Sequence, residues 1–497
     1  MVLVASRLPT RTDASWGTSL LAGLARLGVA LATATMGVAV VGALAVRPIA
    51  DDLVINAKVE QLHGPFPAFG SWMTTWTGYY SGYGLLTALA GATRALGIDK
   101  YTFAIASVAF LVLIVVSVRA CVNASKRLGV TDWAWPEAIV LTAGLLGSFV
   151  GPLKESLHAN LYEAIYWASA WISHLLPVVA CPLLIIAIVR LHNRAVQVSV
   201  AFLAAMFIAG FGLAETVVVT ATLCASAWVA YRLRGRDALS KHRPTLAAAG
   251  FGLVAGTVVV ALLPGTAARA RYLESYHLGL SAHRGLGNLT RATAHIALSD
   301  AKAVVLSPAP ALGLLIGLAL CLAPFSRTRA QLTEALPSLL IASWGVVFVT
   351  WLAVAFGDLS SSQASWHVLP LATAVYVASL ITGYALGSRT NVKYLPMGVG
   401  VCLVVALTLT TLQTTVVAEA AIDRARVFDD NVRSAQVARD HRPPRPTTWY
   451  SMSIGNMTDA AASGPNDWAA TAVAQWLRIP ADDLVIVPVS LPKARFF

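Results

Sequence analysis

Uncharged apolar stretches of about 20 residues recur along the whole chain, and they limit its fold more than any other feature. A helix of that length crosses the hydrocarbon core of a bilayer, so each stretch predicts a transmembrane helix. Eleven stretches meet this description. They cover residues 28–46, 101–118, 136–152, 169–189, 197–214, 216–231, 246–263, 303–324, 338–356, 368–387 and 395–417.

The composition points the same way. Charged residues make up 12% of the chain and the mean hydropathy is +0.69, whereas soluble domains carry about 25% charge. We therefore predict an all-α polytopic membrane protein with a transmembrane domain at 1–418. Residues 419–497 begin with a charged helix and end in the strand-like run Leu484–Val487, which predicts a small α+β appendage.

The short basic connections predict the topology. Lys and Arg favour the cytoplasmic side of a membrane. A twelfth apolar segment, 78–98, would place every internal basic loop outside if it crossed the bilayer. We therefore expect it to be a juxtamembrane or re-entrant helix against the outer leaflet. The N-terminus is then cytoplasmic and the C-terminal tail external. The basic loops are 119–135, 190–196, 232–245, 325–337 and 388–394.

The net charge of +12 has to be interpreted with this topology. The cytoplasmic share orients the chain against anionic lipids, and the external share lies mainly in 264–302. No nucleic-acid partner is predicted. The Ala/Val/Leu/Arg bias is typical of a bacterial genome with high GC content, which predicts a bacterial plasma (inner) membrane.

Two adjacent carboxylates, Asp51 and Asp52, follow the first predicted span and open the external region 47–100. A carboxylate beside the membrane interface could act as a general base toward a hydroxyl. The pair could also bind a divalent cation, Mg²⁺ or Mn²⁺, through hard oxygen ligands. The alternative is that one of them starts or caps a helix. Glu215, at a tight external turn, could cap a helix or serve a function, because acids near the membrane often mark functional sites. His174, one turn inside its span, could contact substrate or only a neighbouring helix.

Several short motifs, in order along the chain, resemble those of the GT-C superfamily of integral-membrane glycosyltransferases. The first is the external loop with Asp51-Asp52 and a helix lying on the membrane. Glu163-Ala164-Ile165-Tyr166-Trp167 is similar to a Glu-x-x-Tyr-Trp loop. Pro264–Arg269 resembles Pro-Gly-Asn-x-x-Arg, with Thr266 in the Asn position, and Asp467-Trp468 resembles a motif of the tail.

The resemblance implies inverting transfer of a sugar from a polyprenyl-phosphate donor on the external face. The acceptor would be a cell-envelope glycan, a lipid or a protein. Arabinofuranose is the sugar of some family members, while mannose or another hexose fits the residues equally well. Asp51 would be the base and Asp52 would orient it or help to hold a metal; no other cofactor is implied.

The same resemblance implies roles for two further groups of residues. The donor phosphate would be bound by Arg269, Arg271, Lys154, His158, His277 and Arg284. The sugar or acceptor would be bound by Glu163, Tyr166, Trp167, Tyr79, Tyr80 and His367. For the arginines the alternative is binding of lipid headgroups, and for the aromatic residues it is anchoring at the membrane interface.

Two other classes of function remain open. A transporter or flippase for a lipid-linked substrate would favour broken helices and ionisable residues near the middle of the membrane. A membrane-bound acyltransferase or polymer ligase could use the same polyprenyl carriers. The predicted spans carry almost no charge near the middle of the membrane and show no repeat between halves, which disfavours the transporter, and the Asp51-Asp52 pair favours glycosyl transfer over the acyltransferase or ligase.

Overall fold

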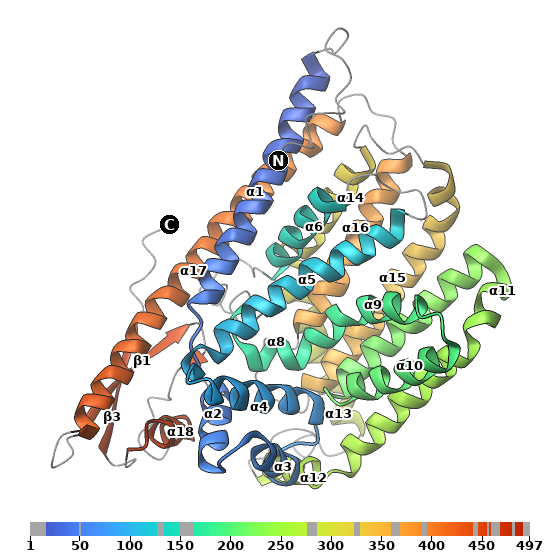
Figure 1. Ribbon diagram of the computed structural model, residues 1–497. Coiled ribbons are helices and arrows are strands. Elements are labelled where there is room, and N and C mark those ends of the chain that lie inside the picture. Colours follow the sequence, from blue (N-terminus) through green and yellow to red (C-terminus); the bar gives the residue numbers. More distant parts are fainter. Residues whose placement is uncertain are drawn as a thin grey trace.

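The computed structural model describes most of the chain (Figure 1). The described residues are 16–48, 51–126, 134–149, 164–275, 286–322, 329–358, 368–389, 395–440, 446–454, 457–458, 468–479 and 483–490.

Long apolar helices form a bundle that identifies a membrane-embedded protein. Seven helical segments among the described residues are long and apolar enough to cross a membrane. Two of them are halves of α11, which bends at Gly235 in the left-handed region (φ 73°). The elements that contain these segments are α1 (Trp16–Leu44), α5 (Thr102–Lys126), α11 (Leu213–Leu262), α15 (Arg329–Asp358), α16 (Val368–Arg389) and α17 (Leu395–Asp440).

Two further spans are broken. Helix α8 (Ala168–His174) meets α9 (Leu176–Val189) at a bend of 46°, and α13 (Leu286–Val305) meets α14 (Ala309–Leu322) at 45°. A proline lies at each break, Pro177 in the first turn of α9 and Pro308 directly before α14. Proline cannot continue the preceding helix, because its ring clashes with the backbone and it has no N–H to donate.

Each of the eleven predicted spans contains a helix. Fewer helical segments among the described residues are long and apolar enough to cross a membrane. The described part gives seven, or nine if each broken pair counts as one span. The two others are α6 (Ala134–Ser148) and α10 (Arg194–Ala209), which hold 15 and 16 residues. Helix α13, which the sequence did not predict, occupies the second half of the connection 264–302.

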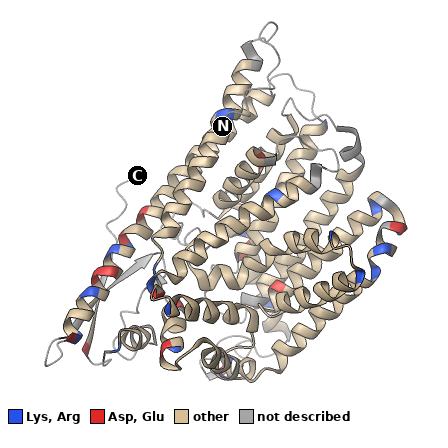
Figure 2. Ribbon diagram, in the orientation of Figure 1, with Lys and Arg blue, Asp and Glu red and all other residues tan. Residues whose placement is uncertain are grey.

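Charged residues gather at the bend of α11 rather than along its two apolar halves. Figure 2 shows Lys and Arg together with an acid at the bend of α11, where Arg232, Arg236, Lys241 and Arg243 lie. The first and last residues of α11 both lie at the end of the bundle opposite to this bend. That opposite end, which we call the site end, carries α2 (Asp51–Gln61), α3 (Pro65–Thr75), α4 (Tyr80–Ala95) and α12 (Pro264–Ser275) (Figure 1). Helix α4 is the helix that the sequence predicted at 78–98.

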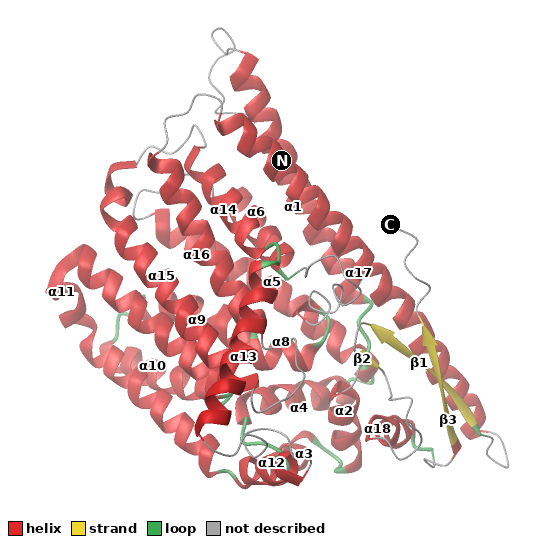
Figure 3. Cartoon of the chain, turned by 180° about the vertical axis from the view of Figure 1, so that it is seen from behind, coloured by secondary structure: helices red, strands yellow, loops and turns green. Residues whose placement is uncertain are grey.

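The C-terminal residues form a small unit on the same end. Helix α17 continues without interruption to Asp440, and the unit contains β1 (Thr447–Ile454), β2 (Met457–Thr458), α18 (Trp468–Leu477) and β3 (Leu484–Ser490). Strand β1 pairs antiparallel with β2 and parallel with β3, and the parallel pair is connected through α18 (Figure 3). The strand that the sequence predicted at 484–487 is confirmed as part of β3.

The C-terminal unit packs on α2 and α17 through its own apolar core. Trp449 is fully buried and contacts Phe428 of α17 edge to face, with ring centroids 5.5 Å apart. Leu53 and Ala57 of α2 belong to the same cluster. The amide of Asn431 on α17 donates to the Tyr450 carbonyl (2.9 Å) and accepts from the Tyr450 N–H (3.1 Å), so the helix side chain bonds to strand β1 as a neighbouring strand would.

Candidate functional site

The paired carboxylates open helix α2, as the capping interpretation expected. Helix α2 begins at Asp51. Negative side chains in the first turn are stabilised by the positive end of the helix dipole. The backbone of Asp51 is described, whereas its side chain lies outside the described part.

Asp52 does more than begin its own helix. The residue is fully buried, and its Oδ1 accepts hydrogen bonds from the Ser169 backbone N–H (3.2 Å) and hydroxyl (2.6 Å). Ser169 lies in the first turn of α8, where backbone N–H groups have no partner within the helix. The Asp52 carboxylate therefore caps α8 from another segment and joins α2 to the broken span.

Replacing Ser169 by alanine tests this bond. The variant loses the hydroxyl donor but keeps the N–H, and a hydrogen bond to a charged group contributes about 1.5 kcal/mol or more. We expect a thermal unfolding midpoint several degrees below that of the wild type in detergent. Ser169→Thr keeps the hydroxyl and serves as the control. An alanine variant as stable as the threonine variant would show that the hydroxyl does not hold Asp52.

Helix α17 holds the segment that leads into Asp51. Arg424 is 1% exposed and donates to the carbonyl oxygens of Arg47 (2.9 Å) and Pro48 (2.5 Å). The guanidinium of Arg47 in turn binds both carboxylate oxygens of Asp429, at 3.0 and 2.9 Å. Arg424 and Asp429, both in the C-terminal half of α17, thus fix the backbone before the paired acids.

The Pro264–Arg269 motif interlocks with the residues just before α4, Thr77 and Gly78. Gly265, in the first turn of α12, packs against the backbone of Thr77, so closely that a Cβ there would lie 2.5 Å from the Thr77 carbonyl oxygen. Gly78 packs in the same way against Thr266 and the Val260 carbonyl. Only glycine permits these approaches, which explains why both Gly265 and Gly78 are glycines. The Thr266 hydroxyl donates to the Val260 carbonyl at 2.6 Å.

This interlock places Arg269 over two aromatic rings. Its Cζ lies 5.5 Å from the ring centroid of Tyr79 and 5.9 Å from that of Trp76. Burial raises the pKa of the Tyr79 phenol, Arg269 opposes that shift, and Glu215 adds to it. The Tyr79 ring therefore lies within electrostatic reach of a cation and a carboxylate.

Glu215 and His174 form a second buried pair. The imidazole Nδ1 lies 2.6 Å from Glu215 Oε1, and the side chains are 13% and 5% exposed for His174 and Glu215 respectively. His174 is the last residue of α8, at the break with α9, and Glu215 is in the first turn of α11. The helix dipoles favour a cation at the first position and an anion at the second.

Helix α8 links the two parts of the site. Ser169, which binds Asp52, and His174, which binds Glu215, are five positions apart on this helix. At 1.5 Å per residue they are separated by about 7.5 Å along the helix axis. Asp52 thus contacts the start of α8, while the end of α8 contacts Glu215, which acts electrostatically on Tyr79 beside Arg269. We call Tyr79, His174, Glu215 and Arg269 the Tyr79–Arg269 cluster.

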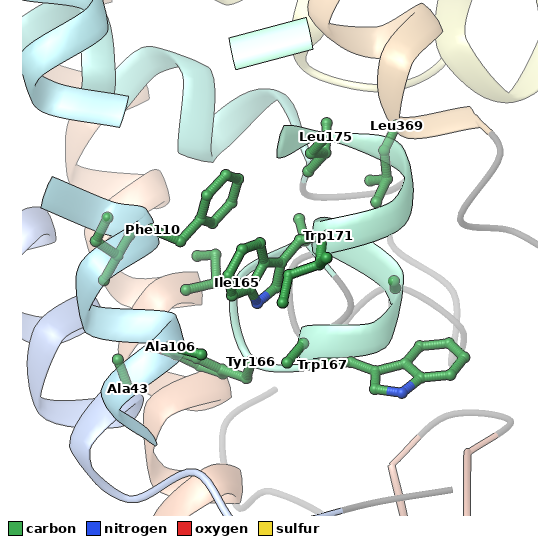
Figure 4. Close-up of a cluster of buried hydrophobic side chains, with 14 of the residues drawn as sticks. Ala43, Ala106, Phe110, Ile165, Tyr166, Trp167, Trp171, Leu175 and Leu369 are labelled. Atoms are coloured by element: carbon green, nitrogen blue, oxygen red, sulfur yellow. The ribbon is translucent and has the colours of Figure 1, made fainter. Parts of the chain in front are cut away.

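Three aromatic residues that were expected to bind substrate serve packing in the structure. Tyr166 is fully buried and its hydroxyl donates to the Ala39 carbonyl (3.1 Å), which does not fit direct contact with a sugar. The Tyr80 hydroxyl donates to the Met206 carbonyl (2.5 Å) and ties α4 to α10. Figure 4 shows Tyr166 directed toward Ala106 and Trp167 directed the opposite way, and Trp167 is 8% exposed.

The remaining predicted site residues are less informative. Arg271 is exposed on α12, two positions after Arg269. Several predicted residues lie outside the described part of the chain: Lys154, His158, Glu163, His277, Arg284 and His367.

A metal site was expected at Asp51 and Asp52. The described residues contain no group of three His, Cys, Asp or Glu side chains that could hold a metal ion. Asp52 Oδ1 already accepts two hydrogen bonds from Ser169. Coordination of Mg²⁺ or Mn²⁺ by the pair stays a prediction, and we assign no step of the reaction to a metal.

The sequence did not predict two contacts of the site, the one between Asp52 and Ser169 and the one between His174 and Glu215. Ser169 is 117 residues from Asp52, and Glu215 is 41 residues from His174. The nearest signal in the sequence was that His174 lies three residues before Pro177 and Glu215 lies three residues after Gly212, at positions where helices break or turn. Comparisons of the chain with protein-family models, with curated proteins and with solved structures give no significant match.

Proposed function

We propose that the protein is a GT-C-like glycosyltransferase that uses a polyprenyl-phosphate sugar on the external face of a bacterial plasma membrane. The observation that supports this most is the juxtaposition at the site end. A buried Asp52 that is bonded to the start of α8 positions the paired acids, and His174 at the end of α8 binds Glu215, which acts electrostatically on Tyr79 beside Arg269. Those groups suit a sugar attached to a phosphate.

The proposed reaction is a single inverting displacement. The acceptor oxygen forms a bond to the anomeric carbon while the bond from that carbon to the phosphate oxygen breaks. The electron pair leaves with the prenyl phosphate, and the acceptor proton passes to the Asp51 carboxylate. Asp52 acts as a positioning residue, because Ser169 fixes one of its oxygens.

Arg269 stabilises the charge that develops on the leaving phosphate. A guanidinium presents donors that match phosphate oxygens, and the rings of Tyr79 and Trp76 hold it at the site end. Because the leaving group is a phosphate, the reaction needs a cation at this position more than it needs a strong acid.

The proposal is tested with the full-length protein in proteoliposomes. Arabinofuranosyl, mannosyl and glucosyl prenyl phosphates, each radiolabelled, are supplied with membrane glycan, lipid or protein acceptors. We expect transfer from one donor, and Arg269→Ala is expected to lower kcat/KM about 100-fold. Arg291→Ala removes an exposed arginine of α13 and should leave the rate unchanged. Absence of transfer from every donor would refute the proposal.

One observation favours a transporter of lipid-linked substrates as the second candidate. Asp300 is 7% exposed in α13, which belongs to a broken pair, and its Oδ2 has no hydrogen-bonding partner among the described residues. Buried ionisable residues in broken spans are typical of transport pathways. The same proteoliposomes discriminate the two functions, since a transporter moves the donor across the bilayer without any acceptor.

A further inference from the structure

Lys58, in the last turn of α2, places a cation at the site end. Its ammonium lies 4.1 Å from the ring centroid of Trp72 on α3. The side chain is half-buried, and no carboxylate of the described residues forms an ion pair with it. Burial lowers the pKa of the amine, which is the direction expected for an ammonium that loses water without gaining a counter-ion.

The described carboxylates of α2 already have partners. Glu60, two positions after Lys58, pairs with both Arg94 and Arg478. Asp52 is bound at the start of α8. A partly desolvated cation without a counter-ion is destabilised, and an anion from outside the chain would stabilise it. Because Lys58 is half-buried, its ammonium can be reached from the surface of the site end.

The same short part of α3 meets a second cation. The Trp76 N–H donates to the Trp72 carbonyl (3.1 Å), so the two tryptophans are one helical turn apart. Arg269 lies 5.9 Å from the ring centroid of Trp76 and has no ion pair within the described chain. Helix α12 is seated there by Gly265, whose added Cβ would be 2.6 Å from the Met73 carbonyl oxygen. Two cations without counter-ions among the described residues thus approach residues 72–76.

Lys58 also shares a face of α2 with the proposed base. Asp51 lies seven positions earlier, which is nearly two full turns and about 10.5 Å along the helix axis. In an in-line displacement the base, the acceptor oxygen, the anomeric carbon and the leaving phosphate follow one another. The hydrogen bond and the attack each span about 3 Å, so a phosphate-binding cation on the order of 10 Å from the base fits this order.

Building on the proposed glycosyl transfer, we propose that Lys58 binds the donor phosphate together with Arg269. The cation–π contact with Trp72 holds the ammonium from one side, and its remaining N–H groups donate to phosphate oxygens.

Two cations match the charge of the leaving group better than one. The donor is a phosphodiester with one negative charge. When the bond from the anomeric carbon to the phosphate oxygen breaks, the electron pair stays on that oxygen, and the released monoester approaches two negative charges near pH 7. Lys58 therefore stabilises charge that develops during transfer more than it stabilises the bound donor.

The first test measures binding of the product, which needs no turnover. Radiolabelled prenyl phosphate without a sugar is titrated onto the full-length protein in detergent, and the uncharged prenol serves as the control ligand. We expect Lys58→Met to raise the Kd for prenyl phosphate about 10-fold or more and to leave binding of the prenol unchanged. Lys58→Arg keeps the charge and should stay within about threefold of the wild type.

Lys100→Met is the matched control variant. Lys100 also lies over an aromatic ring, 4.8 Å from the centroid of Tyr101, but in the 3₁₀ turn before α5 rather than on α2. It should keep wild-type binding and transfer. In the transfer assay, Lys58→Met should lower kcat about 100-fold with little change in the KM for the donor, because the lost interaction forms mainly in the transition state.

Other outcomes would overturn the inference. An unchanged Kd for prenyl phosphate in Lys58→Met would show that Lys58 does not bind the phosphate. Equal losses in Lys58→Met and Lys100→Met would reflect the net charge of the site end alone. A lower thermal unfolding midpoint and weaker binding that Lys58→Arg did not restore would indicate only a structural role. If the wild type bound prenyl phosphate through Lys58 but transferred no sugar, the proposed function alone would fail, so the two failures are distinguishable.

Discussion

Asp51→Asn is expected to lower the rate of glycosyl transfer about 1,000-fold, which is the largest effect on activity that we predict. The amide has nearly the same shape as the carboxylate but cannot take the proton of an acceptor hydroxyl. The start of α2 and the bond from Asp52 to Ser169 should remain. The measurement is the initial rate of transfer in proteoliposomes at saturating donor.

The control for Asp51→Asn is Asp237→Asn, which changes an exposed aspartate near the bend of α11, at the opposite end of the bundle. It should transfer at the wild-type rate. If Asp51→Asn kept more than a tenth of the wild-type rate while its thermal unfolding midpoint was unchanged, another group would have to accept the proton.

Arg424→Met should have the largest effect on stability. The substitution roughly keeps the volume of the side chain but removes both donors to the carbonyls of Arg47 and Pro48, which would be left buried without them. A buried acceptor left without its donor costs about 1–3 kcal/mol. Because those carbonyls precede Asp51, we also expect slower transfer.

Arg426→Met provides a matched control on the same helix. Its side chain is 73% exposed and pairs with Asp423, an i,i+3 pair, and exposed pairs of this kind contribute less than about 1 kcal/mol. The midpoints of thermal unfolding of the two variants should therefore differ clearly. Equal midpoints would mean that Arg424 does not anchor the segment before Asp51.

The sequence was sufficient to locate the apolar spans but not every helix or the joints between helices. Uncharged runs identify spans because charge is costly in lipid, and each predicted span contains a helix. The breaks before α9 and α14 follow from Pro177 and Pro308, and could have been predicted from those prolines. Helix α13 was missed because its Ala, Ser and Thr residues give it a weaker apolar signal than the other spans.

The site was predictable in parts. Asp51-Asp52 and Pro264–Arg269 stand out as motifs, and the structure brings Arg269 to the aromatic run that includes Tyr79. The Ser169 and His174 contacts depend on which helix ends meet in space, and a single sequence carries no record of such pairings. Tyr166 was predicted to bind substrate but is buried in the core, because the sequence of a motif does not distinguish an aromatic residue that binds a ligand from one that packs in a core.

Helix α17 sets the distance between the membrane and the C-terminal unit. Its 46 residues contain neither glycine nor proline after Gly400, and at 1.5 Å per residue they extend about 69 Å, more than twice the roughly 30 Å of a hydrocarbon core. Each residue also turns the helix by about 100°. One inserted residue beyond the membrane would rotate Asn431 away from β1 and Arg424 away from Pro48 together, so length and rotational phase of this helix jointly set the position of the paired acids.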